Sequence, residues 1–260
     1  MKCGEIIEEL EKKYPLFMAE PWDNPGLLAG RREKEVRKVY IALDATDRVI
    51  GEAEKAGADL LLTHHPMVFS ALKKVNTDDF IGRRLVELIR GDISYYAMHT
   101  NYDVVTMGEQ AAEMLRLRDT EIMEVTYDDG SRQEGLGRTG ELPGEMSLAE
   151  CGRYVKQVFG LDTVRLFGNP EQKVSRAAVL PGSGKSLVDA ALRTGADVMI
   201  SGDFGHHDGI DAVMRGLTVI DAGHYGIEKI FVSQMAGYIR ETFTGLTVYT
   251  EKDENPFWVV

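Results

Sequence analysis

The sequence predicts an α/β fold made of a duplicated strand–helix unit with largely parallel sheets. Two observations predict it: apolar strands alternate with amphipathic helices, and the same order of elements recurs later in the chain. Such alternation favours parallel strands because each helix carries the chain back to the start of the next strand. The chain has 260 residues, of which 43% are hydrophobic, so it can bury a sizeable core.

The first unit begins with a helix, which we expect over Gly4–Lys13. Its apolar residues Ile6, Ile7 and Leu10 lie on one helical face. A loop dense in Pro and Gly follows this helix. Strands and helices then alternate, with strands expected over Lys38–Leu43, Asp59–Leu62 and Ile93–Met98 and helices over Asp47–Ala56 and Asp79–Arg90.

The segment Val36–His65 recurs as Val174–Asp203 at a fixed offset of 138 residues without gaps. In both copies a strand and a helix lead to a Gly-Ala-Asp sequence and a second strand. Five of the 30 aligned positions are identical, namely Val36/Val174, Ala53/Ala191, Gly57/Gly195, Ala58/Ala196 and Asp59/Asp197. We interpret this as an internal duplication. The alternative is that two ordinary strand–helix–strand units look alike.

A polar, Gly-rich stretch near residues 120–133 marks the expected boundary between the repeats. We therefore predict that the second repeat covers residues 125–228. The first repeat would comprise residues 1–124 and 229–260. A long helix over 227–242 and a final strand, LTVYTE, follow the second unit and would pack back onto the first.

Composition narrows the classes of function. The formal net charge of −12 disfavours binding to nucleic acid, because phosphates would be repelled. The two cysteines, Cys3 and Cys151, lack metal-type spacing and indicate a reducing, cytoplasmic setting. The charged N-terminus does not resemble a signal peptide, and no apolar run is long enough for a membrane helix.

All six histidines lie in four short segments that each follow a predicted strand: LLTHHP, MHTNYD, GDFGHHD and DAGHYGIE. Open α/β sheets bind ligands beyond the carboxyl ends of their strands. A lone histidine is more often a packing or surface residue. The shared placement of all six nevertheless indicates one functional site.

Three imidazoles and two carboxylates from these segments form the predicted metal-ligand set: His64, His65, Asp103, His224 and Glu228. Adjacent side chains in extended backbone point apart, so His64 and His65 could serve two different ions. His224 and Glu228 are four residues apart and would share a helical face. Five ligands exceed the three of a typical open catalytic site and suit two ions. The mixed nitrogen and oxygen set favours Zn, Mn, Fe, Co or Ni.

Several motifs resemble the Nif-three-like metal-binding family, often labelled type 2 homologues of GTP cyclohydrolase 1. They are LLTHHP, HTNYD, GHYGIE, WDNPGL, LDAT, GLGRTGEL, PGSG and ENPF, in the family's order along nearly the whole chain. The resemblance implies two intertwined, duplicated α/β repeats with mostly parallel, mixed sheets and a metal site between them. It implies that the five ligands hold two divalent metal ions per chain, and it implies a ring-shaped homohexamer. It supplies no secure substrate.

Other residues near these motifs have less certain roles. His99, four residues before Asp103, is the first candidate for a catalytic proton-transfer group, and the alternative is a structural hydrogen bond. His206 and His207 could support the site from the second copy. The segment Trp22–Asn24 is expected to be a structural turn, and the alternative is a contact with substrate.

The segment GSGKS at Gly182–Ser186 resembles a phosphate-binding loop. The full pattern requires a glycine five residues before Gly184, where Val179 stands. A weaker phosphate contact at the following helix remains an alternative.

Three classes of function remain. The favoured class is a metal-dependent hydrolase acting on a small molecule, either a cyclohydrolase or amidohydrolase acting on a nucleotide, or a phosphoesterase. The second is a metal-handling protein that stores or delivers an ion without turnover. The third is a regulatory interaction protein whose metals are structural.

Overall fold

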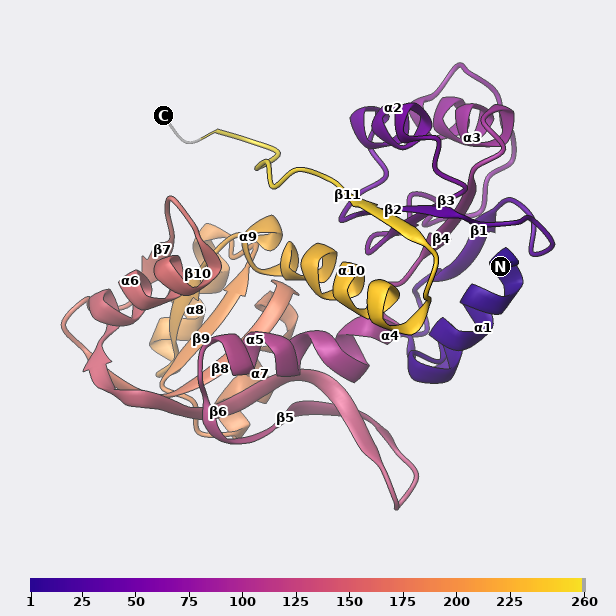
Figure 1. Ribbon diagram of the computed structural model, residues 1–260. Helices are drawn as coiled ribbons and strands as arrows, with labels where there is room; N and C mark the ends of the chain where they lie inside the picture. Colours follow the sequence, from indigo (N-terminus) through magenta and orange to yellow (C-terminus); the bar gives the residue numbers. More distant parts are fainter. Residues whose placement is uncertain (259–260) are drawn as a thin grey trace. The chain divides into compact units, whose positions relative to one another are not determined.

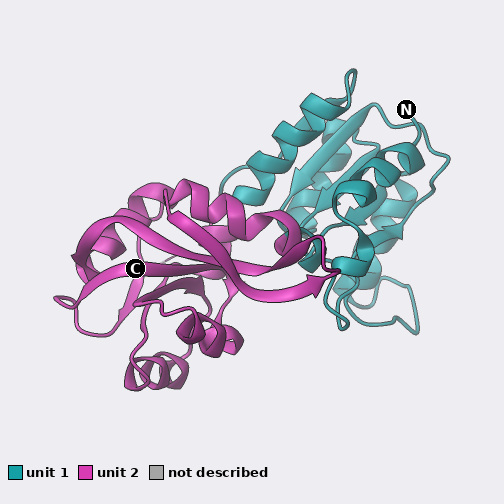
Figure 2. Cartoon of the chain, turned by 90° about the horizontal axis from the view of Figure 1, so that it is seen from below, with its two compact units in different colours: residues 1–102, 229–253 teal, residues 103–228, 254–260 magenta. Residues whose placement is uncertain are grey.

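The computed structural model describes residues 1–258 and divides the chain into two compact units, coloured separately in Figure 2. Unit 1 comprises Met1–Tyr102 and Lys229–Asp253, and unit 2 comprises Asp103–Glu228 and Glu254–Val260. Residues 259 and 260, which the predicted first repeat includes, lie outside the described residues. Unit 1 is therefore assembled from two segments that are distant in the sequence.

Unit 1 is built on a sheet with the strand order β1-β4-β3-β2-β11. Its strands are β1 (Gly26–Ala29), β2 (Lys38–Ala42), β3 (Leu60–Thr63), β4 (Ser94–Ala97) and β11 (Thr247–Thr250). Strands β2, β3, β4 and β11 run parallel, and β1 pairs with β4 in the antiparallel direction. The final strand pairs with β2, so the prediction that it packs back onto the first unit is confirmed.

Unit 1 contains helices of several lengths. They are α1 (Cys3–Lys13), η1 (Leu16–Met18), α2 (Asp47–Ala56), α3 (Phe80–Arg90), α4 (Thr100–Tyr102) and α10 (Ile230–Thr242). The Thr46 hydroxyl accepts a hydrogen bond from the first turn of α2, and Gly57 ends that helix with a left-handed backbone. Asp79 caps α3 in the same way. These caps explain why the predicted helix bounds agree with the structure.

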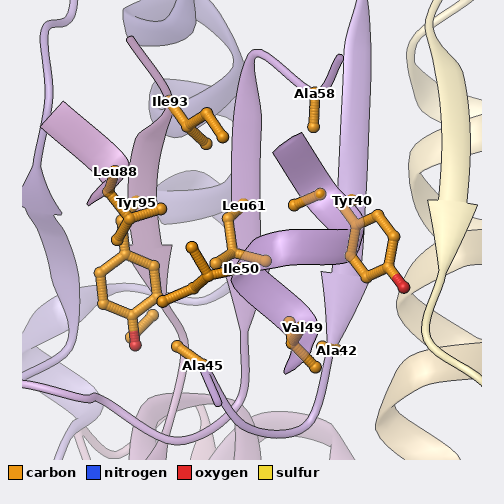
Figure 3. Close-up of a cluster of buried hydrophobic side chains, with 12 residues drawn as sticks. Tyr40, Ala42, Ala45, Val49, Ile50, Ala58, Leu61, Leu88, Ile93 and Tyr95 are labelled. Carbon is orange, nitrogen blue, oxygen red and sulfur yellow. The ribbon is translucent and has the colours of Figure 1, made fainter. Parts of the chain in front are cut away.

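A buried apolar cluster fills the space between the sheet and two helices of unit 1. Figure 1 shows α2 and α3 side by side on one face of the sheet. Val49 and Ile50 from α2 and Leu88 from α3 pack against Leu61 and Tyr95 of the sheet (Figure 3). Every residue of β3 and β4 is buried. Polar chemistry on these strands is therefore confined to their ends.

Unit 2 is built on a second sheet with the strand order β5-β6-β8-β9-β10-β7. Its strands are β5 (Arg118–Asp128), β6 (Gln133–Ser147), β7 (Arg165–Phe167), β8 (Lys173–Ser183), β9 (Val198–Gly202) and β10 (Thr218–Asp221). Strands β8, β9 and β10 run parallel, whereas β5, β6 and β7 add antiparallel pairs at the two edges. The second sheet is thus mixed around a parallel core.

Short helices accompany this sheet. They are the π-helical turn η2 (Asp103–Met107), α5 (Gly108–Met114), α6 (Leu148–Phe159), η3 (Lys185–Leu187), α7 (Val188–Arg193), α8 (His206–Met214) and α9 (His224–Glu228). The polar stretch near residues 120–133 lies in the hairpin of β5 and β6. Polar side chains suit β5 because it is an edge strand and mostly exposed.

The two units share one hydrogen-bonding pattern at the offset of 138 residues. In unit 1, Asp59 Oδ2 accepts hydrogen bonds of 2.8 and 3.0 Å from the backbone N–H groups of residues 37–38. In unit 2, Asp197 Oδ2 accepts bonds of 2.8 and 2.9 Å from those of residues 175–176. The glycine two residues before each aspartate has a left-handed backbone, with φ of 65° and 72°. This repeated geometry supports the predicted duplication.

Candidate metal centre

The histidines of unit 1 follow two neighbouring parallel strands. His64 and His65 come directly after β3, and His99 lies two residues after β4. Because β3 and β4 pair in parallel, their carboxyl ends meet at one edge of the sheet. The predicted position of these histidines at strand ends is therefore confirmed.

The three imidazoles form a compact cluster within unit 1. Their nitrogen ligand atoms all lie within 4.8 Å of one another. The ring centroid of His64 lies 4.8 Å from that of His65 and 5.2 Å from that of His99. His64 is buried, and the side chains of His65 and His99 are only 22% and 15% exposed. Neutral imidazoles at this spacing can share a metal ion.

Each imidazole of the cluster directs its Nδ1 atom at an oxygen acceptor. The acceptor is the Met98 carbonyl oxygen for His64, at 2.8 Å, and Asp44 Oδ1 for His65, at 2.9 Å. For His99 it is Asp23 Oδ1, at 2.7 Å. Carbonyl and carboxylate oxygens only accept, so Nδ1 carries the proton and the ring lone pair lies on Nε2. This is the orientation that metal-binding histidines adopt.

Asp23 holds His99 through a buried carboxylate. Its Oδ2 atom also accepts hydrogen bonds from the backbone N–H and the hydroxyl of Thr100, at 3.0 and 2.5 Å. Burial by itself would raise the pKa of Asp23, but the hydrogen bonds from His99 and Thr100 lower this pKa to about 2. Asp23 is therefore ionised at neutral pH. The expected structural turn at Trp22–Asn24 thus also orients a candidate catalytic histidine.

In unit 2, His224 and Glu228 lie one turn apart on α9. His224 Nε2 is 2.8 Å from Glu228 Oε2, and His224 Nδ1 is 2.8 Å from Asp203 Oδ2. The Glu228 side chain is almost fully buried. The helical spacing predicted for this pair is confirmed, and it brings an imidazole nitrogen and a carboxylate oxygen together as a divalent metal ion requires.

The Glu228 carboxylate packs against a glycine at the end of β8. Gly182 has a left-handed backbone with φ of +80°, and a Cβ atom placed on it would lie 2.4 Å from Glu228 Oε1. A side chain at this position would therefore displace the carboxylate. The PGSG motif provides close backbone approach at Gly182.

Asp103 is the first residue of the π-helical turn η2 in unit 2. Such turns within helices often occur at functional sites, because the extra residue changes the direction of a side chain. Asp103 directly follows Tyr102, the last residue of the first segment of unit 1. A second chain connection between the units likewise adjoins a predicted ligand, since Lys229 of unit 1 follows Glu228 of unit 2.

Comparison with known proteins places these features in a family. The profile of Duf34/NIF3 (NGG1p interacting factor 3) matches residues 1–256. The chain belongs to the DUF34/NIF3 family. This agrees with the resemblance inferred from the motifs.

Relatives and solved structures of the DUF34/NIF3 family match the chain over almost its whole length. A Clostridium perfringens protein named GTP cyclohydrolase 1 type 2 homolog is 35% identical over 243 residues, covering 93% of this chain and 92% of that protein. A Lactococcus lactis protein of the same name is 35% identical over 265 residues, covering 99% of each. The crystal structure of a Bacillus cereus protein related to NIF3 covers 100% of this chain and 99% of its own, with a TM-score of 0.91 and 26% identity.

The remaining residues that the sequence analysis of this DUF34/NIF3 protein singled out lie on elements of unit 2. His206 and His207 are exposed in the first turn of α8, and their ring centroids are 5.1 Å apart. The segment Gly182–Ser186 spans the end of β8 and the start of the short 3-10 helix η3. Among residues 1–258, no helix is both long and apolar enough to cross a membrane.

The sequence analysis did not assign any carboxylate the role of orienting a histidine. Asp44 lies two residues past β2 and Asp203 one residue past β9, so both occupy strand ends like the histidines themselves. An acidic residue just beyond a predicted parallel strand was therefore an available signal. Asp23 carried no such signal, because it lies in a loop that precedes β1.

Proposed function

We propose that this DUF34/NIF3 protein is a metal-dependent hydrolase that binds two divalent metal ions per chain. The proposed ligands are His64, His65, Asp103, His224 and Glu228. The substrate would be a small molecule, and the name of the relatives suggests a nucleotide. The family resemblance also leads us to propose a homohexamer.

The common orientation of the imidazoles carries this proposal. In His64, His65 and His224, Nδ1 faces an oxygen acceptor at 2.8 to 2.9 Å. Such a bond makes the other ring nitrogen more basic and holds the ring in place, which favours a metal ion at Nε2. Imidazole with carboxylate suits Zn, Mn, Fe, Co or Ni better than Ca or Mg, which prefer oxygen alone.

The two predicted carboxylate ligands are close in the sequence to residues that contact His64. Asp103 is joined by one peptide bond to Tyr102, whose ring centroid lies 6.3 Å from that of His64. Glu228 is three residues before Phe231, whose ring centroid lies 5.2 Å from that of His64. Consecutive Cα atoms are about 3.8 Å apart, so both carboxylate residues are tethered close to contacts of His64.

His99 is the proposed proton-transfer residue. When bound, the metal ions would activate water and stabilise the charge that develops on the substrate. His99, with Nδ1 held by Asp23, can give or take a proton at Nε2. The ionised Asp23 carboxylate stabilises the protonated imidazole and fixes its tautomer.

Metal content per chain, measured by elemental analysis on protein without a His-tag, tests the ligand set. We expect two ions in the wild type and loss of both in Glu228→Ala, with His64→Ala also losing metal but keeping the wild-type mass in solution. His207→Ala is the matched control, because His207 is exposed and outside the ligand set. An absence of metal in the wild type after soaking with Zn or Mn would contradict the proposal.

Turnover is tested separately with the metal-loaded protein. We expect hydrolysis of a nucleotide or a phosphoester, with a fall of about 10²–10⁴-fold in kcat for His99→Ala. A protein that holds two ions but hydrolyses none of these compounds would instead be a metal-handling or regulatory protein.

A further inference from the structure

Two exposed aromatic rings stand beside the histidine cluster of unit 1. Trp22 and Phe69 are 57% and 48% exposed, and their ring centroids are 5.8 Å apart. Both rings also contact His99, with centroid distances of 5.9 and 6.5 Å. The two rings therefore form an apolar surface directly next to a cluster of imidazoles.

The backbone that carries these rings is held in place by hydrogen bonds. Asp23, the neighbour of Trp22, binds both His99 and Thr100. Asn24 Nδ2 donates a hydrogen bond of 2.6 Å to the backbone oxygen of Val68, the neighbour of Phe69. Two loops that are distant in the sequence are thereby joined to each other and to the cluster. Rings held in this way lose little conformational entropy when a ligand binds.

We propose that Trp22 and Phe69 form a stacking platform for a planar heteroaromatic ring of nucleobase size in the substrate. The inference rests on the proposed hydrolase function and names the substrate class of that site. A flat ring stacks on aromatic faces, while the nitrogen and oxygen atoms at its edge can meet the adjacent imidazoles. A substrate that consists only of sugar and phosphate would gain little from two aromatic rings.

Trp22 itself provides the readout. The sequence contains two tryptophans, and the other, Trp258, is 83% exposed in unit 2. In a Trp258→Phe protein, Trp22 is the source of tryptophan fluorescence. We expect GMP or UMP to quench this fluorescence with saturation, whereas ribose 5-phosphate does not. Absence of quenching by both nucleotides, or equal binding of ribose 5-phosphate, overturns the platform.

Matched variants in the Trp258→Phe background test the second ring. We expect Phe69→Leu to raise the Kd for the nucleotide about tenfold, because one stacking contact is lost. Leu72→Ala is the control, since Leu72 is an exposed apolar residue in the same loop. If Phe69→Leu changes the mass of the protein in solution but not the Kd, the rings form a subunit contact and the proposal is wrong.

The metal content of each sample separates this proposal from the proposed function. Quenching by nucleotide in a protein that binds no metal would support the platform and contradict the hydrolase. Two ions per chain without quenching would contradict the platform and leave the ligand set standing. A Phe69→Leu protein that keeps its metal but binds the nucleotide more weakly supports both.

Discussion

At the scale of single residues, the site depends on oxygen atoms that orient imidazoles. Asp23, Asp44 and Asp203 each accept a hydrogen bond from a different histidine. An imidazole by itself can rotate and change tautomer. The presence of a histidine in a motif therefore does not determine which ring nitrogen faces a metal ion. The acceptor decides this, and it comes from another part of the chain in each case.

Gly182→Ala tests whether close backbone approach positions Glu228. The new Cβ atom would lie 2.4 Å from Glu228 Oε1, so the carboxylate must move. We expect less bound metal in elemental analysis and a lower free energy of unfolding in urea. Gly195→Ala is the control, because Gly195 also has a left-handed backbone but a Cβ atom there meets nothing within 4 Å.

The control should lower the free energy of unfolding by only about 1–2 kcal/mol, the cost of a left-handed backbone for alanine. Gly182→Ala should lower it further and Gly195→Ala should keep its metal. Equal stability of the two variants together with equal metal content would show that Gly182 does not position the carboxylate.

At the scale of elements, parallel strands bring residues of separate motifs to one sheet edge. β3 and β4 are adjacent and parallel, so the residues after them become neighbours although 34 positions separate His64 from the Met98 carbonyl oxygen that it contacts. The Gly-Ala-Asp sequence lies at the opposite ends of the strands, just before β3 and β9. There its aspartate accepts hydrogen bonds from the backbone near the start of the preceding parallel strand, β2 or β8.

Asp59→Ala and Asp197→Ala test whether these hydrogen bonds contribute equally to stability in the two repeats. Each substitution removes a carboxylate oxygen that accepts two backbone hydrogen bonds. We expect both to lower the free energy of unfolding by about 1–3 kcal/mol in urea denaturation. The exposed Asp162→Ala is the control and should change little. A large effect in one repeat and none in the other would argue against equivalent roles.

At the scale of the whole molecule, unit 1 requires both ends of the chain. Its second segment, residues 229–253, supplies α10 and the strand β11. Phe231 on α10 is fully buried and lies with its ring centroid 5.0 Å from that of Tyr102. Folding of the first segment is therefore coupled to the last helix.

Phe231→Ala tests this coupling. We expect the free energy of unfolding to fall by about 3–5 kcal/mol, because a large buried ring is replaced by a cavity. Amide hydrogen exchange should show the lost protection in β2, β3 and β4 of unit 1. Phe257→Ala is the control, since Phe257 is exposed near the end of the chain. Unchanged protection of these strands would contradict the coupling.

The sequence by itself determined the α/β class, the family, and the position of histidines at strand ends. These properties depend on local periodicity and on motif order, which can be read along the chain. His224 and Glu228 could likewise be paired, because a helical turn alone brings residues four apart onto one face. The five-residue ligand set stays a prediction.

Only the tertiary structure decided which carboxylates orient the histidines and which rings stand beside them. Asp23 and His99 are 76 residues apart, and Trp22 meets Phe69 from a different loop. Loops before and after the strands carry no periodic signal, and their contacts arise only when the sheet places them at a common edge. That long-range packing turned an expected turn at Trp22–Asn24 into part of the candidate site.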